Sequence, residues 1–265
     1  MQHLKKIAFF ALLFIFSLKV SATYLLIPMD HTQKNHLKAY GIAYWVIENN
    51  IEMDWLLNYR GGSFMVKHVK AIEEELIIRG VSFEVIANVK STAILQEIAD
   101  PEINMDVVKL YKAPKIAVYS PKNKQPWDDA VTLVLAYAEI PYKVIYDDEI
   151  IEDKLPEYDW LHLHHEDFTG QYGKFYFAYK NAAWYREQVR YNEEMATRLG
   201  FNKVSQLKLA VAKKIKDFTF GGGFLFAMCS GTDALDIALA AEGLVICESM
   251  YDGDPADPRA QQKLD

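Results

Sequence analysis

Cysteine is scarce in this chain, because Cys229 and Cys247 are the only two among 265 residues. A small domain held together by several disulfides is therefore excluded, since one bridge at most can form. The same scarcity limits the candidates for a nucleophilic thiol to these two positions. The fold must instead depend on an apolar core, for which the 51% of hydrophobic residues is sufficient.

Basic residues are too few to balance the acidic ones. The chain has 29 Lys and Arg residues against 36 Asp and Glu residues, which gives a formal charge of -7 at pH 7. An acidic protein repels polyanions, so we expect neither nucleic acid nor an anionic lipid surface as a partner. The composition makes no prediction of the oligomeric state.

Long hydrophobic runs are absent apart from one near the N-terminus. Residues 1–22 combine a basic head, an apolar run and small residues, which read MQHLKK, IAFFALLFIFSL and VSA. This pattern predicts a secretory signal peptide cleaved after Ala22. Lys19 interrupts the run before it reaches the ~20 apolar residues that a bilayer requires, so we expect no permanent membrane span. The mature protein is therefore expected to be exported, either periplasmic or secreted.

After residue 22 the hydrophobic pattern alternates between strand and helix. In residues 23–113, strands are predicted at TYLLIPMD, MDWLLNY and VSFEVIA, and helices at NHLKAYGIAYWVIENN and VKHVKAIEEELIIRG. Strands that alternate with helices typically pair in parallel, so we predict an N-terminal βαβ region. The segment DPEINMDVVKLYKAP breaks the rhythm with two prolines and indicates a domain boundary near residue 113.

A second α/β run occupies residues 114–265. Its predicted strands are KIAVYS, YKVIYD, YDWLHLHH, GGFLFAMC and LVICES, and its predicted helices are PWDDAVTLVLAYAE, residues 181–217 and GTDALDIALAAEG. The fold class that follows is α/β, with a mostly parallel, flavodoxin-like three-layer sheet. The segment DPADPRAQQKLD begins like a helix but has no signal for the end of one. This pattern predicts that the region is truncated at its C-terminus.

One turn in this second region has the pattern of a nucleophile elbow. AMCSG lies between a predicted strand and a predicted helix, and the small residues Ala227 and Gly231 stand two positions before and after Cys229. In such a turn the helix N-terminus stabilises a thiolate, and free amides bind an oxyanion. We predict Cys229 as a nucleophile, with the amides of Ser230 and Gly231 as oxyanion donors. The alternative is a buried thiol at an ordinary strand-to-helix turn.

Through this turn and its strand order, residues 114–265 resemble the class I glutamine amidotransferase-like superfamily, whose flavodoxin-like sheet carries a cysteine at such an elbow. The whole chain, through YLLIPMD, NHLKAYGIAYW and WLLNYRGGSF, is similar to exported bacterial proteins labelled asparagine synthetase B. The superfamily resemblance implies amide hydrolysis or acyl transfer, completed by a histidine and an acid that follow the cysteine. In this chain no histidine follows His165.

The asparagine synthetase label implies catalytic features that this sequence lacks. Enzymes of that type use an N-terminal cysteine and a separate ATP-binding domain, whereas no cysteine precedes Cys229 in this chain. We also find no glycine loop of the kind that binds pyrophosphate. We therefore expect no ATP-dependent synthesis and no cofactor.

HLHHED, residues 162–167, is the densest group of titratable side chains in the sequence. In a flavodoxin-like strand order this strand end neighbours the Cys229 turn at the carboxyl edge of the sheet, where α/β proteins bind their ligands. His165 or His164 would then act as the base for Cys229, and Glu166 is a further catalytic candidate.

The same six residues allow two other interpretations. His162 and His164 lie on one face of a strand, so they are suited to a metal site that Glu166 or Asp167 completes. Alternatively, these polar side chains only terminate a strand and bond to neighbouring backbone. We assign no metal ligand.

Two further stretches have the composition of ligand sites. NYRGGSF places Arg60, Gly61 and Gly62 between a predicted strand and a predicted helix, where an anionic group can bind; the alternative is a turn capped by Ser63. GQYGKFYFAYKNAAWY concentrates aromatic rings, which either line a ligand cleft or hold this segment on the core. The expected partner is therefore a small molecule or a peptide-like ligand.

Two functions follow from these patterns. The leading hypothesis is an exported, cysteine-dependent amidohydrolase or related acyl-transfer enzyme acting at Cys229. The alternative is a non-catalytic, envelope-associated binding module that retains the fold. The lack of a histidine after His165, and Ala227 in place of the glycine of the elbow motif, favour that alternative.

Overall fold

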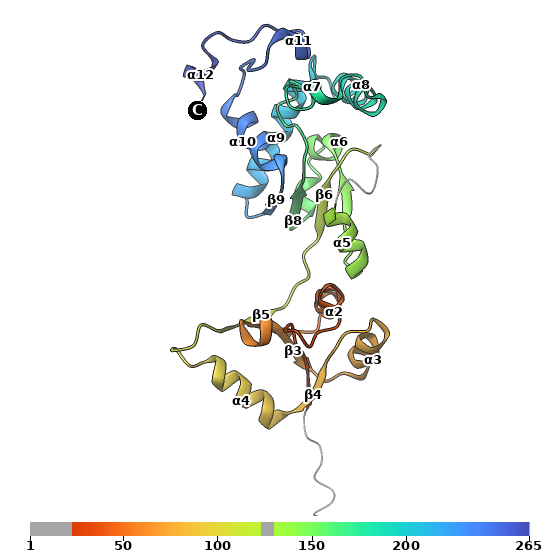
Figure 1. Cartoon of the computed structure of the whole chain (residues 1–265), viewed down its shortest axis with the longest axis vertical. Coiled ribbons are helices and arrows are strands. Elements are labelled where there is room, and N and C mark those ends of the chain that lie inside the picture. The colour runs from red at the N-terminus through yellow and green to blue at the C-terminus, as the bar shows by residue number, and fades with distance from the viewer. Residues whose placement is uncertain (1–22, 123–129, 265) are drawn as a thin grey trace, which may run out of the picture. The chain divides into compact units, whose positions relative to one another are not determined.

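The computed structural model describes residues 23–122 and 130–264. The predicted signal peptide, residues 1–22, lies outside the described residues. The chain divides into two compact units, of which unit 1 holds the residues up to Ala113 with Val134–Ile140, and unit 2 holds Pro114–Leu133 with Pro141–Asp265. Each unit contains one sheet with helices packed on it, so the chain is of the α/β class (Figure 1). Within the described ranges no helix is long and apolar enough to cross a bilayer.

Unit 1 is built from a β-α-β-β-α-β core followed by one more helix and strand. The elements are β1 (Thr23–Ile27), α2 (His36–Glu48), β2 (Met53–Leu57), the 3-10 turn η1 (Tyr59–Gly61), β3 (Ser63–Lys67), α3 (Lys70–Ile78), β4 (Glu84–Ala87), α4 (Asn88–Ile98) and β5 (Asp106–Leu110). The strand order is β4-β1-β3-β2-β5, and every neighbouring pair is antiparallel. The strands and helices from β1 to β4 therefore have the split βαβ topology.

The antiparallel sheet shows that the prediction of a parallel βαβ region was wrong in its pairing. Helix α2 does connect β1 to a strand of the same direction, but β3 pairs between β1 and β2. The sequence pattern merged β3 with the helix that follows it, because a five-residue strand directly after a tight turn is too short to show its own period. The Arg60 turn therefore joins two strands and not a strand and a helix.

Glycines make that turn possible. Gly61 and Gly62 have φ values of 82° and 92°, a region that residues with a side chain rarely adopt. A Cβ atom on Gly61 would lie 2.5 Å from the carbonyl oxygen of Met29, so the chain passes too closely for any side chain there.

Both faces of the unit 1 sheet are buried, because successive residues of a strand point to opposite faces. Leu25 and Ile27 of β1 pack with α2 and α3, whereas Leu26 packs with α4. Figure 1 shows α4 on the opposite side of this sheet from α2 and α3. Burying one such side chain contributes about 1.5–3 kcal/mol, so β1 links two apolar layers that hold unit 1 together.

Unit 2 contains the predicted parallel sheet. From Pro114 onward the elements are β6 (Ile116–Tyr119), α5 (Ala130–Ala138), β7 (Lys143–Ile145), α6 (Asp147–Ile151), the 3-10 turn η3 (Leu155–Glu157), β8 (Trp160–Leu163), α7 (Tyr176–Tyr179), α8 (Ala183–Arg198), α9 (Val204–Phe220), β9 (Phe224–Ala227), α10 (Ser230–Ala240), α11 (Ser249–Asp252) and α12 (Ala260–Lys263). The part of α5 from Val134 onward is grouped with unit 1. The strand order is β7-β6-β8-β9, with all pairs parallel. The chain reverses its direction across the sheet between β6 and β8, which is where open α/β sheets bind ligands.

Helix α9 covers the core of unit 2. Leu207, Val211 and Ile215 repeat at helical spacing along one face of α9 and are fully buried against the sheet. The opposite face of β9 is different, because Phe224 and Phe226 are 61% and 40% exposed there. This parallel sheet is therefore covered well on the α9 face and incompletely on the other.

The predicted strand LVICES is not a strand in the structure. The side chain of Gln171, which is buried, takes the place of a neighbouring strand: its amide nitrogen donates to the carbonyl of Leu244 (2.9 Å), and its oxygen accepts from the N–H groups of Ile246 (2.8 Å) and Cys247 (3.2 Å). A backbone whose polar groups are satisfied in this way needs no sheet partner. The apolar run thus packs beside the helices without joining the sheet.

Candidate functional site

The carboxyl ends of all four parallel strands carry polar side chains. These are Tyr119 at the end of β6, Tyr146 and Asp147 after β7, His164 to Asp167 after β8, and Cys229 after β9. Strands β8 and β9 are paired in register from Trp160 with Phe224 to Leu163 with Ala227. The histidine segment and the cysteine turn therefore leave the sheet side by side, as the sequence predicted.

Cys229 is the residue before the first turn of α10, and its backbone is strained. Its φ and ψ are 51° and -136°, which is a region that residues other than glycine avoid at a cost on the order of 1–3 kcal/mol. The residue is exposed and its thiol is free. The alternative of a buried thiol is thus wrong, and the turn has the geometry that a nucleophile elbow requires.

Gly231 fixes this turn against the histidine segment. Its N–H donates to the carbonyl oxygen of His164 over 2.6 Å, and a Cβ atom at this position would lie 2.4 Å from the same oxygen. The Gly231 amide is therefore occupied and does not serve as the predicted oxyanion donor. Ser230 is the first residue of α10, so its N–H is one of those that a helix leaves without an intrahelical acceptor.

The three histidines occupy different places. His162 is fully buried, and its Nδ1 atom lies 3.1 Å from the carbonyl oxygen of Phe226 on the next strand. The rings of His164 and His165 lie with their centroids 4.3 Å apart beyond the end of β8. His165 also lines a cavity, described below, and so does Glu166. The two predicted base candidates are thus neighbours of each other, on a segment whose backbone contacts the elbow through Gly231, whereas His162 belongs to the sheet interior.

Lys174 is a residue of the site that the sequence analysis missed. Its Nζ atom donates to the carbonyl oxygen of Ser230 over 3.0 Å, which places an ammonium group at the start of α10. Partial burial of the ammonium lowers the pKa of Lys174, although the residue as a whole is exposed; the charges of Asp167 and of a Cys229 thiolate act in the opposite direction. Lys174 and Ser230 are 56 positions apart in the sequence, so no local pattern connects them.

A cavity of about 570 Å³ lies beside the histidine segment within unit 2. Polar groups from His165, Glu166, Asp167 and Asn192 face aromatic rings in its lining, and the rings are those of Tyr146, Tyr172, Phe175, Tyr179, Trp184 and Tyr185. Most of these rings belong to the aromatic stretch that the sequence analysis singled out. The rings therefore line a cavity, as the ligand-cleft interpretation predicts, and Tyr172 also packs on the core of unit 2, as the other interpretation predicts.

A buried polar network forms one end of this cavity. The ammonium of Lys208, a residue only 2% exposed, donates to Asp147 (2.9 Å), to the hydroxyl of Tyr119 (2.8 Å) and to that of Tyr146 (3.0 Å). Tyr119 donates to Asp147, and Tyr146 donates to Asn192 (3.0 Å). Burial raises the pKa of both tyrosines well above the ordinary value, so both hydroxyls keep the proton that they donate. The network holds α9 to the ends of β6 and β7.

The Arg60 turn belongs to unit 1, and its guanidinium is already engaged. Arg60 donates to Asp30 (2.7 Å), to Glu84 (2.6 Å) and to the hydroxyl of Thr32 (3.2 Å). The hydrogen bond from Arg60 is the main reason that the pKa of Asp30 lies well below its ordinary value. These contacts favour the structural alternative for Arg60 and its two glycines over an anion site.

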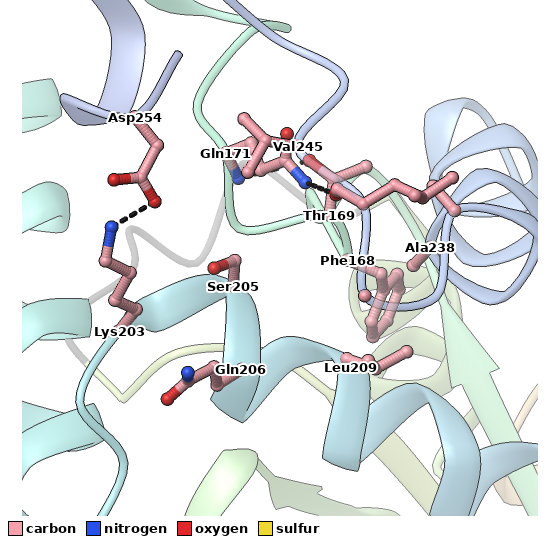
Figure 2. A pocket seen from close by; sticks show the side chains of 13 residues that line it. Phe168, Thr169, Gln171, Lys203, Ser205, Gln206, Leu209, Ala238, Val245 and Asp254 are labelled. Atoms are coloured by element: carbon pink, nitrogen blue, oxygen red, sulfur yellow. Dashed lines mark hydrogen bonds and ion pairs between the residues drawn. The ribbon is translucent and has the colours of Figure 1, made fainter. Parts of the chain in front are cut away.

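The remaining candidates offer less chemistry. Among residues 23–122 and 130–264, no group of three or more His, Cys, Asp or Glu side chains is arranged to hold a metal ion, so the metal interpretation of HLHHED has no ligand set there. Figure 2 shows a smaller pocket of about 190 Å³, where Lys203 forms an ion pair with Asp254 and Gln171 lies beside Val245. Its polar groups are already paired or neutral, and we assign no activity to it.

Comparisons with known proteins add no relative to this picture. No protein-family model matches the chain, and neither a curated protein nor a solved structure matches it. The functional conclusion therefore depends on the residues and geometry described above.

Proposed function

We propose that this protein is an exported, class I glutamine amidotransferase-like enzyme that hydrolyses amides, or transfers their acyl groups, through Cys229. The observation that carries the proposal is the backbone of Cys229, with φ 51° and ψ -136° between a parallel strand and a helix. A backbone strained in this way, at an exposed thiol, is typical of sites where function maintains the strain. The strand order β7-β6-β8-β9 also supports the flavodoxin-like assignment.

The proposed reaction uses the groups at this edge of the sheet. His164 or His165 accepts the thiol proton, and the sulfur of Cys229 bonds to the carbonyl carbon of the substrate. The oxygen that becomes negative is stabilised by the Ser230 N–H and the N-terminus of α10. The amine then leaves with the proton from the imidazolium, and water cleaves the thioester to release the acid and restore the thiol.

Lys174 supports the same chemistry. Its ammonium group lies at the start of α10, where a positive charge stabilises the negative oxygen that develops next to the Ser230 N–H. In this proposal Lys174 acts through its charge and through its hydrogen bond to Ser230, and it does not contact the reacting atoms.

Alkylation of the full chain by iodoacetamide at pH 7 tests this proposal, with mass spectrometry of the two cysteine peptides over time. We expect Cys229 to react about ten-fold or more faster than N-acetylcysteine, because its thiol is exposed at the start of α10 and a neighbouring histidine is proposed to accept its proton. Cys247 is the internal control and should react slowly, since burial raises the pKa of its thiol. Lys174→Met should slow the reaction at Cys229 several-fold, whereas Lys180→Met should not.

A rate at Cys229 no greater than that of N-acetylcysteine would contradict the proposal. The envelope-associated binding module would then be favoured, because the cavity of about 570 Å³ is lined without Cys229 and is complete in its absence.

A further inference from the structure

The cavity beside the histidine segment is lined by an excess of acidic groups. Glu166, Asp167 and Glu187 all line it. Lys208 lines it as well, but its charge is compensated by Asp147, which is fully buried and does not line the cavity. An anionic ligand would be repelled by this lining, and a cation would be attracted.

The walls of the cavity are aromatic. The centroid of the Trp184 ring lies 5.0 Å from that of Tyr179 and 5.8 Å from that of Tyr185. The planes of the Trp184 and Tyr185 rings are nearly perpendicular, at 86°. Tyr172 and Phe175 add two more rings to the lining. Aromatic faces carry negative electrostatic potential and attract cations, while their carbon atoms pack against apolar groups.

Two tyrosine hydroxyls in this lining have no hydrogen-bond partner among residues 23–122 and 130–264. Tyr185 is 6% exposed, and within the described part of the chain neither its hydroxyl nor that of Tyr172 makes a hydrogen bond. Burial, together with the charge of Asp167, raises the pKa of Tyr185 to about 12, so the group stays neutral with free lone pairs. Native proteins rarely leave buried polar groups unpaired, which indicates that a group entering from outside completes them.

We propose that this cavity binds an ammonium group on an apolar stem, with the carboxylate of Asp167 and the tyrosine hydroxyls accepting its N–H groups and the rings enclosing its stem. For catalysis at Cys229 this identifies the substrate class as amides or esters that also carry an amine, and that extension rests on the function proposed above. Binding itself does not require the thiol.

Calorimetric titration of the Cys229→Ala chain with three six-carbon probes tests the proposal. Hexylamine, hexanol and hexanoate share the stem and differ in charge. We expect hexylamine to bind about ten-fold more tightly than hexanol, with hexanoate the weakest. Equal binding of hexylamine and hexanol, or tighter binding of hexanoate, would overturn the proposal. This comparison uses one protein and does not depend on how a cavity variant folds.

Two further variants locate the site. Asp167→Asn in the same chain should weaken hexylamine binding about ten-fold and leave hexanol binding unchanged. Asp236→Asn, at one of the exposed acids of α10, provides the control. Trp184→Leu should also weaken the binding of hexylamine. If neither Asp167→Asn nor Trp184→Leu weakens hexylamine binding, the assignment of the site to this cavity is refuted.

The two proposals fail separately, because the titrated chain has no thiol at position 229. Tight amine binding with slow Cys229 alkylation would overturn only the catalytic proposal. Fast alkylation without amine selectivity would overturn only this one.

Discussion

Cys229 is the residue at which backbone strain and proposed chemistry coincide. Glycine adopts φ 51° and ψ -136° freely, whereas alanine carries the same Cβ penalty as cysteine. We therefore expect Cys229→Gly to be more stable than Cys229→Ala by about 1–2 kcal/mol, after allowing for the greater freedom of glycine in the unfolded chain. Urea unfolding followed by circular dichroism measures this difference. If the alanine variant is equally stable, the backbone at this position is not strained.

Lys208 and Asp147 form an ion pair whose two partners are almost completely buried. Lys208→Met leaves the Asp147 carboxylate without its cation in a dry environment, so we expect a loss of about 3–5 kcal/mol in the free energy of unfolding. The double variant Lys208→Met with Asp147→Asn removes both charges and should recover part of that loss. Urea unfolding of the three proteins provides the measurement. A loss below about 1 kcal/mol in the single variant would show that the pair is not shielded from water.

The sequence predicted those site residues that are close together in the chain. Cys229 and the pair His164 and His165 were selected as candidates because small residues and clustered histidines form local patterns. Lys174 and Lys208 were missed, because they reach the strand ends from segments 56 to 89 residues away from their partners. The sequence analysis predicted the Gly231 N–H as an oxyanion donor, but this N–H donates to the carbonyl oxygen of His164. That contact is a tertiary one, which no local pattern reveals.

At the scale of elements, the start of α10 is locked against the end of β8 through Gly231. A Cβ atom there would meet the His164 carbonyl at 2.4 Å, and backbone cannot move aside as a flexible side chain can. We expect Gly231→Ala to lose about 1–3 kcal/mol of unfolding free energy and to slow alkylation of Cys229, because α10 must shift. Gly221→Ala is a matched control: its Cβ would meet neighbours at 3.3 Å, and its φ is -74°. Equal stability of the two variants would refute this account of the junction.

Elements with a long, clear hydrophobic period were predicted well. Helix α2 and strands β6 and β8 follow their patterns closely. The helical stretch predicted over residues 181–217 is instead two helices, α8 and α9, separated by a turn at Gly200. Strand β3 was missed because it is short and runs almost directly into a helix, and β5 because two prolines near it suggested a loop. LVICES has the composition of a strand, but the side chain of Gln171 satisfies its backbone, and no property of the segment itself reveals that.

At the scale of the whole molecule, alternation of strands and helices predicted the α/β class but not the pairing. The same alternation produced an antiparallel sheet in unit 1 and a parallel sheet in unit 2. The difference depends on one strand, β3, which follows η1 and pairs between β1 and β2. In the sequence this strand is hidden by the helical period of the segment that follows it. Direction of pairing is therefore a property of connections between elements, and it requires the tertiary structure.

The strained backbone at position 229 also has an evolutionary consequence. In a lineage that no longer used the thiol, mutation to glycine would be favoured, since glycine relieves the strain without moving the turn. A lineage under selection for the thiol would keep cysteine in spite of its cost. The residue at position 229 in a related sequence therefore indicates whether the thiol chemistry was retained. In the present chain, cysteine at this position lowers stability relative to glycine because of its backbone strain.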